Sequence, residues 1–179
     1  MQQQAVLQFW FEETPPAAWW KKDPAFDALV AQRFGALLDS ARTGELQSWR
    51  ESAPGALAEV IVLDQFSRNI FRDTPQAFAQ DAVALVLAQE AIRRGLDRLL
   101  TAQQRVFLYL PYMHSESRLI QQESIRLYRA LGIESNLDFA LKHKAINDRF
   151  GRYPHRNAVL GRPSTAEEIA FLATPGSSF

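Results

Sequence analysis

The chain has 179 residues, of which 47% are hydrophobic, 20 are basic and 20 are acidic, and it contains no cysteine. This length can bury the core of one domain, residues 1–179. The missing cysteines exclude disulfides, thiolate metal sites and cysteine nucleophiles, as is usual in a cytoplasmic protein. The balanced charge favours no nucleic-acid partner, and the longest apolar run, residues 82–88, is far too short to span a membrane. The N-terminus lacks the basic start of a secretory signal.

Apolar residues recur at helical spacing along most of the chain, and capping residues, glycines and prolines separate the segments. The spacing predicts a first helix that Pro15-Pro16 stops, and further helices at residues 24–44, about 56–72, 75–95, 101–111, 119–132, 135–151 and after 164.

Three local signals in this series make specific predictions. Pro111 lacks the N–H that a helix interior needs, so the helix that contains it should kink or break there. Ser135 with Asp138 should start the next-to-last helix. Ser164-x-x-Glu167 matches a capping box for the last one.

No convincing pair of strands occurs, so the predicted fold class is all-α. Consecutive helices with short connections favour antiparallel helical hairpins stacked on one another in a single domain. The chain shows no clean 34-residue repeat, and a regular solenoid is therefore not predicted.

The segment VIVLDQFSRNIFR, residues 60–72, places polar residues in an apolar helix. Asp64 and Arg68 are four residues apart and share a face, while Gln65 and Asn69 share the adjacent stripe and Arg72 extends the row. The pattern fits a solvated face with one salt bridge. It equally fits a polar network that points into a cleft, because burial of unpaired polar groups is costly.

The segment LPYMHSE, residues 110–116, contains His114 and Glu116, which a regular helix would place on opposite sides. A metal-dependent, hydrolase-type site would need them to join His143 and His155 as ligands. No HExxH or similarly spaced pair exists, and nearby arginines would repel a cation. No metal site is predicted, and this reading is kept only as an alternative.

The segment from His143 to Asn157 concentrates positive charge near the C-terminus. Between Lys142 and Arg162 lie six basic residues and one acid, Asp148. Gly151 and Pro154 end the helix, so that a stiff loop displays Arg152, His155, Arg156 and Asn157. The arginines can clamp the loop to acids such as Asp64, Asp81 or Glu116, or they can form an anion pocket. Base stacking on RNA by Phe150 and Tyr153 is weaker, since few aromatics interleave.

These stretches, together with FWF, WW, FLYLPYMHSE, LGRPSTAEE and the terminal GSSF, resemble the bacterial domain-of-unknown-function family numbered 924. The match spans nearly the whole chain. Ser67 stands where the family usually has proline, and Tyr153 where it often has phenylalanine. The resemblance implies an all-helical fold similar to tetratricopeptide-type helix pairs without regular repeats, and it implies no established activity. The family-motif positions are Asp64, Gln65, Arg68, Asn69, His114, Glu116, Gln121, His143, Arg152, His155, Arg156 and Asn157.

The favoured hypothesis is a polar cleft that binds a small anionic ligand, with no cofactor identified. Arginine forks would hold the anion, and His114 or His155 would transfer protons, oriented by Glu116 or Asp64. The ligand-binding set is Asp64, Gln65, Arg68, Asn69, Gln121, His143, Arg152, Arg156 and Asn157. One alternative is an interaction module whose helical groove captures a peptide carboxylate, and another is a purely architectural role for these motifs.

Overall fold

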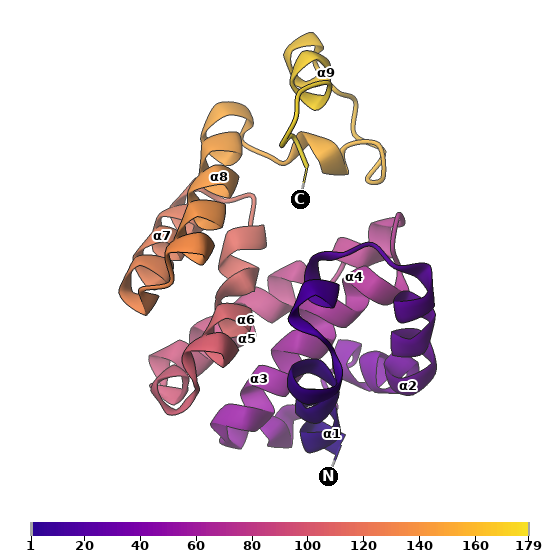
Figure 1. Ribbon diagram of the computed structural model, residues 1–179, viewed down its shortest axis with the longest axis vertical. Helices are drawn as coiled ribbons and strands as arrows, with labels where there is room; N and C mark the ends of the chain where they lie inside the picture. Colours follow the sequence, from indigo (N-terminus) through magenta and orange to yellow (C-terminus); the bar gives the residue numbers. More distant parts are fainter. Residues whose placement is uncertain (1, 179) are drawn as a thin grey trace. The chain divides into compact units, whose positions relative to one another are not determined.

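Helices make up almost all the regular structure of residues 2–178, the part of the chain that the computed structural model describes, and no strand occurs in that range. The all-α prediction is therefore confirmed. The last residue of the GSSF segment lies outside the described residues. The α-helices are α1 (Gln2–Gln8), α2 (Pro24–Arg42), α3 (Ala53–Ile61), α4 (Ser67–Ile70), α5 (Asp81–Arg93), α6 (Ala102–His114), α7 (Arg118–Leu131), α8 (Glu134–Phe150) and α9 (Ala166–Leu172) (Figure 1).

The chain divides into two compact units, which are described separately here. Unit 1 consists of residues up to Arg72 together with Gln76–Pro111, and unit 2 of Asp73–Pro75 together with Tyr112 onward. The prediction of one domain over residues 1–179, and that of a tetratricopeptide-like superhelix, stay predictions. Within residues 2–178, no helix combines the length and the apolar content needed to cross a bilayer.

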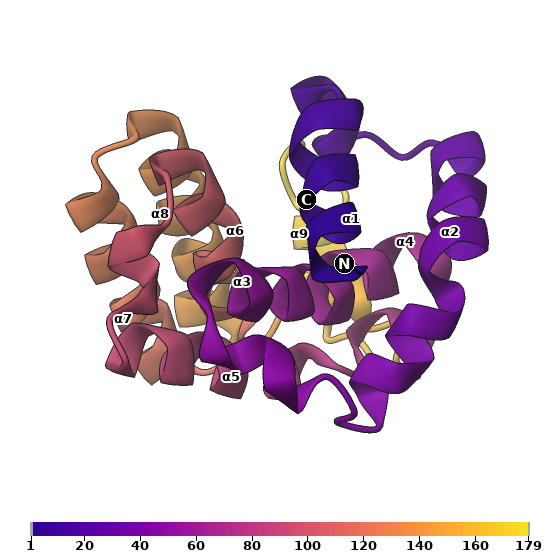
Figure 2. The ribbon, with the colours of Figure 1, turned by 90° about the horizontal axis from the view of Figure 1, so that it is seen from below.

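Unit 1 has an aromatic core. Helix α1 packs against α3 (Figure 2), α2 against α4, and α3 against α5. The rings of Phe9 and Phe66 both pack on Phe34, with centroids 5.0 and 4.8 Å from it, and Trp10 meets Phe66 edge-on at 5.6 Å. These four side chains are buried. The FWF segment is thus part of the core, as its aromatic composition indicates.

Two π-helical turns interrupt the regular helices of unit 1. They are Phe9–Glu13, which continues α1, and Val62–Phe66, which joins α3 to α4. The predicted helix at 56–72 is therefore present as a continuous helical run, but its middle is widened. All five residues of the second turn are buried, including Asp64 and Gln65. Such turns are rare and often occur at functional sites.

Three helix boundaries differ from the prediction. Helix α6 continues through Pro111 and ends at His114, so the break follows the proline by three residues. The predicted helix 75–95 is split into a 3-10 turn, Pro75–Phe78, and α5. Helix α8 starts at Glu134, with Ile133 as an N-cap that makes no side-chain bond, so the prediction of a Ser135 cap is wrong.

Unit 2 is built on the antiparallel hairpin of α7 and α8, which lie side by side (Figure 1). Gly132 at the C-cap of α7 and Gly151 at the C-cap of α8 have φ values of 80° and 70°. Only glycine adopts this left-handed conformation without strain, which is why the two stops were predictable. A 3-10 turn, Pro154–Arg156, follows, and α9 packs against it.

Candidate functional site

In unit 1, the π-helical turn carries an ion-pair network. Arg68 donates two parallel hydrogen bonds to Asp81, at 2.8 and 2.9 Å, and a further bond to the Asp64 carboxylate at 3.1 Å. Gln65 donates to the other Asp64 oxygen at 2.6 Å. The predicted i, i+4 pair is confirmed. The carboxylates hold the Arg68 fork against α5, and the donor to both acids is Arg68 rather than an arginine of the 149–157 loop.

Asn69 and Arg72 bind a different helix. Asn69 donates to Asp27 on α2 at 2.8 Å, and Arg72 makes two bonds to the same carboxylate, at 2.5 and 2.7 Å. Burial acts to raise the pKa of Asp27, but the bonds from Arg72 and Asn69 outweigh it and hold that pKa below its usual value. Asn69 and Arg72 therefore fasten α4 to α2.

In unit 2, Glu116 is the acceptor for a guanidinium that the sequence did not single out. Arg162 donates two parallel bonds to it, at 2.7 and 2.9 Å, and the Tyr153 N–H donates a third at 2.7 Å. Burial acts to raise the pKa of Glu116, yet the Arg162 and Tyr153 bonds hold it below its usual value. Because these bonds occupy both of its oxygens, Glu116 holds the loop that contains Tyr153 and Arg162 in place. The signal available in the sequence was the arginine of the LGRP segment.

Asn157 belongs to the same clamp. It is fully buried, donates to Ser164 at 3.0 Å, and accepts a bond from Arg162 Nε at 3.0 Å. Arg162 also donates to the Tyr153 carbonyl at 3.2 Å. Asn157 therefore supports Arg162 and the loop, and its bonds are those of a structural residue.

Arg152 pairs with Glu168, a partner that the sequence did not indicate. The two side chains form parallel hydrogen bonds of 2.6 and 2.8 Å, and Glu168 is 2% exposed. Glu168 also accepts from the Thr165 N–H and completes a capping box with Thr165 at the start of α9. The predicted box, Ser164 with Glu167, is wrong by one residue. The bond from Arg152, followed by that from the Thr165 N–H, lowers the pKa of Glu168 to about 2.

Two of the three histidines of the chain lie against one buried tyrosine of unit 2, and the third lies next to one of them. The Tyr153 ring is 5.6 Å from that of His143 and 5.7 Å from that of His155, and His114 lies 6.4 Å from His143. The Arg156 guanidinium stacks 4.7 Å above the Tyr153 ring and donates to the His114 carbonyl at 3.0 Å. Arg156 is 6% exposed. This group, defined here as the histidine cluster, brings together four predicted site residues.

His143 is neutral at physiological pH. Its Nδ1 lies 2.8 Å from the Phe139 carbonyl oxygen and must carry the proton, because that oxygen can only accept. In the neutral ring, Nε2 then bears the lone pair. Burial lowers the pKa of His143 to about 3, and the charges of His114, Arg156 and His155 act in the same direction. His143 is consequently an acceptor of hydrogen bonds rather than a proton carrier near neutral pH.

Gln121 supports the cluster from α7. Its amide nitrogen lies 2.7 Å from the Tyr153 hydroxyl, 2.8 Å from the Met113 carbonyl and 2.7 Å from the Ser115 carbonyl. The Tyr153 hydroxyl donates in turn to Met113 at 2.6 Å. Gln121 is fully buried and thus positions Tyr153 and the end of α6.

The metal-site alternative does not fit this geometry. Residues 2–178 contain no group of three or more histidine, cysteine, aspartate or glutamate side chains placed to hold a metal ion. One of the four proposed ligands is committed elsewhere, since both oxygens of Glu116 are bonded to Arg162. The alternative of a hydrolase-type metal site at His114, Glu116, His143 and His155 therefore finds no support in this geometry.

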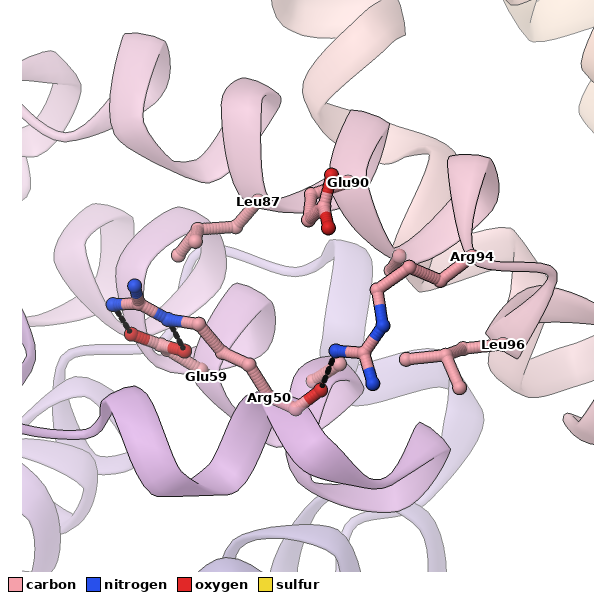
Figure 3. Close-up of a pocket in the computed structure, with 8 residues that line it drawn as sticks. Arg50, Glu59, Leu87, Glu90, Arg94 and Leu96 are labelled. Atoms are coloured by element: carbon pink, nitrogen blue, oxygen red, sulfur yellow. Dashed lines mark hydrogen bonds and ion pairs between the residues drawn. The ribbon is translucent and has the colours of Figure 1, made fainter.

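A small cavity in unit 1 was missed by sequence reasoning. Its volume is about 10 Å³, and its lining includes Arg50, Glu59, Leu87 and Arg94 (Figure 3). The buried Glu59 accepts two bonds from Arg50, at 2.8 and 2.6 Å, and Arg94 donates to the Arg50 carbonyl at 2.5 Å. These bonds hold the 3-10 turn Gln47–Glu51 in place. The cavity has room for about one water and accommodates no larger ligand.

The candidate residues thus form two groups, one in each unit. Asp64, Gln65 and Arg68 meet in unit 1, whereas Asn69 binds Asp27. In unit 2, the histidines and Arg156 meet, whereas Glu116, Arg152 and Asn157 bind partners in the 162–168 segment. The prediction that both groups share one cleft stays a prediction.

Comparison with known proteins identifies the family of this chain but no activity. No curated protein matches it. A solved structure from Agrobacterium tumefaciens, of the protein of unknown function ATU0120, is 40% identical to it and superimposes with a TM-score of 0.91 over 96% of this chain and 97% of that one. The model of the family described as bacterial protein of unknown function (DUF924) matches residues 6–176. The chain therefore belongs to the DUF924 family.

Proposed function

We propose that this protein binds a small anionic ligand, a carboxylate or a phosphate, at the histidine cluster of unit 2. The observation that carries the proposal is the stacking of the buried Arg156 guanidinium on Tyr153, whose ring also lies beside those of His143 and His155, with His114 next to His143. A guanidinium offers a fork of donors that fits carboxylate and phosphate oxygens. Stacking on Tyr153 fixes its plane, so less flexibility is lost when an anion binds.

The other arginines of the loop support this assignment by contrast. Arg152 and Arg162 each make two parallel bonds to one glutamate, Glu168 and Glu116 respectively. Their charges are used to hold the loop, so they are poor candidates for ligand capture. The proposal assigns the anion to Arg156, because its guanidinium is buried and held in one plane on the Tyr153 ring.

The chemistry of the cluster distributes roles among the histidines. A pKa of about 3 makes His143 too weak a base for proton transfer near pH 7, where an effective catalytic group has a pKa near the working pH. His143 would instead accept a hydrogen bond from a protonated phosphate oxygen, since an ionised carboxylate can only accept. His114 and His155, which are partly exposed, are the candidates for proton transfer if the ligand is a substrate.

Isothermal titration calorimetry of the wild type, Arg156→Ala and Arg149→Ala against a series of carboxylates and phosphates tests the proposal. Arg149 is the matched control, because it lies in the same segment but pairs with Glu167 at the surface. We expect one anion class to bind the wild type and Arg149→Ala equally, and to bind Arg156→Ala roughly tenfold more weakly or worse, the effect of one lost charge-assisted bond. The proposal fails if no anion binds, or if a folded Arg156→Ala binds as well as the wild type.

A second candidate is the capture of a peptide carboxylate. Exposed apolar side chains on α7 and α8, namely Leu119, Phe139 and Leu141 with exposed fractions of 69%, 50% and 44%, could contact a peptide. The same titrations distinguish the two candidates. A peptide with a free C-terminus would bind better than its amidated form and better than a free small carboxylate.

A further inference from the structure

Three buried oxygen atoms between α7 and α8 have no hydrogen-bond partner among residues 2–178. They are Gln121 Oε1, Ser124 Oγ and Asn147 Oδ1, from three side chains of unit 2 that are 0% exposed. Nearly all buried polar atoms in folded proteins are satisfied, by protein groups or by ordered water. Three unsatisfied oxygens in one helical hairpin therefore indicate a shared partner.

The orientation of the two amides is determined by their surroundings. The Tyr153 hydroxyl gives its hydrogen to the Met113 carbonyl, so towards Gln121 it can only accept, and the Met113 and Ser115 carbonyls also only accept. Asn147 Nδ2 likewise faces the Glu116 carbonyl at 2.8 Å. Rotating either amide by half a turn would bring oxygen against oxygen. Both amide oxygens therefore point away from these groups and need a donor.

The three side chains come from adjoining positions of the hairpin. The Gln121 and Asn147 amides bond to consecutive carbonyls, those of Ser115 and Glu116, from helices that pack against each other. Ser124 follows Gln121 by three residues, which places it on the same face of α7. The hydroxyl of Ser124 can donate as well as accept.

We propose that a buried water molecule binds between α7 and α8, donating to Gln121 Oε1 and Asn147 Oδ1 and accepting from the Ser124 hydroxyl. This arrangement gives each orphaned atom a partner and gives the water three hydrogen bonds, the usual number for a buried water. An ammonium ion shares the donor chemistry, but it would donate to all three oxygens and would add a charge. The site ties the turn after α6 to both helices of the hairpin, and it shares Gln121 with the support of Tyr153.

A crystal structure of the full chain, grown without ammonium salts and at a resolution that shows ordered water, tests the position. We expect one peak within about 2.7–3.2 Å of Gln121 Oε1 and Asn147 Oδ1. The proposal is overturned if these oxygens bond to protein donors, if no peak joins them, or if the peak occurs only in crystals that contain ammonium.

The sign of a stability change provides a test in solution. Alanine forms helices better than serine, and a buried hydroxyl that bonds nothing carries an uncompensated cost of desolvation. If Ser124 Oγ had no partner, Ser124→Ala would therefore raise the Tm. With the water in place, Ser124→Ala loses a hydrogen bond, and we expect a lower Tm than that of the wild type. Ser135→Ala, an exposed serine of α8, is the control and should show only the small effect of helix propensity on the Tm. A Tm of Ser124→Ala equal to or above that of the wild type overturns the proposal.

Discussion

Two neighbouring glutamates of α9 provide the sharpest test of the structure. Glu167 and Glu168 each pair with an arginine, but Glu167 is exposed and meets Arg149 at the surface, whereas Glu168 is 2% exposed and holds Arg152. The sequence pattern assigned the capping role to Glu167. The structure assigns both the cap and the buried ion pair to Glu168, so matched Glu→Gln substitutions should have unequal effects.

The magnitude follows from the bonds that each substitution changes. Glu168→Gln keeps the shape and can keep the cap, because glutamine also serves in a capping box. It removes the charge from two parallel bonds to Arg152, whose side chain is 27% exposed. Losing one partner of a fully buried pair costs about 3–5 kcal/mol, so we expect about 2–3 kcal/mol here. For Glu167→Gln, an exposed pair, we expect about 0.5 kcal/mol or less.

Urea unfolding followed by far-UV circular dichroism measures both variants. Tryptophan fluorescence is unsuitable, because all four tryptophans, at positions 10, 19, 20 and 49, lie in unit 1.

The pKa of Glu168 is lowered to about 2, so its contribution to stability is present above about pH 4.5 and is lost as the pH falls towards 2. The gap between the wild type and Glu168→Gln should shrink over that interval. Equal losses for the two variants, or a gap that does not change with pH, would refute the reasoning.

Three further outcomes are expected. His143 has a pKa of about 3 in the folded chain against about 6.5 when unfolded, so its contribution to stability is present above pH 6.5 and is lost on acidification. In urea unfolding, the stability advantage of the wild type over His143→Asn should fall by about 2 kcal/mol from pH 7 to pH 5. A constant advantage would contradict a buried neutral ring. Gly55→Ala would place a Cβ 2.1 Å from the Trp49 carbonyl oxygen and should cost about 1–3 kcal/mol, read by tryptophan fluorescence. Gly35→Ala, within α2 and with nothing inside 4 Å, should gain about 0.5–1 kcal/mol in the same assay, and similar effects of the two alanines would contradict the packing described for Gly55.

Local signals predicted the helices well because their physics is local. Asp23 accepts from the N–H groups of Ala25 and Phe26, and Gly132 and Gly151 take positive φ values, all as expected from residues within one turn. The same locality explains the error at α9. Ser164 and Thr165, and likewise Glu167 and Glu168, satisfy the capping pattern equally, and only the burial of Glu168 beside Arg152 selects one register.

The π-helical turn at 62–66 had no signature in the sequence. Its residues have the same apolar spacing as a plain α-helix, and the extra residue is accommodated by packing against the rings of Phe9 and Trp10. The continuation of α6 through Pro111 likewise had no signature in the sequence. The proline removes one hydrogen bond, but burial of Leu108, Leu110 and Tyr112 keeps the segment helical up to His114.

By itself, the sequence determined the all-α class, most helix ends and the set of polar residues that interrupt apolar helices, because hydrophobic periodicity and capping act over a few neighbouring residues. Only the tertiary structure decided how those polar residues pair. Glu116 with Arg162 and Arg152 with Glu168 are separated by 46 and 16 residues, and many other acids and arginines of the chain could have met instead. The packing of distant segments decides which charged side chains hold the loop and which side chains surround Tyr153. That packing follows from burial of the whole core rather than from any one motif.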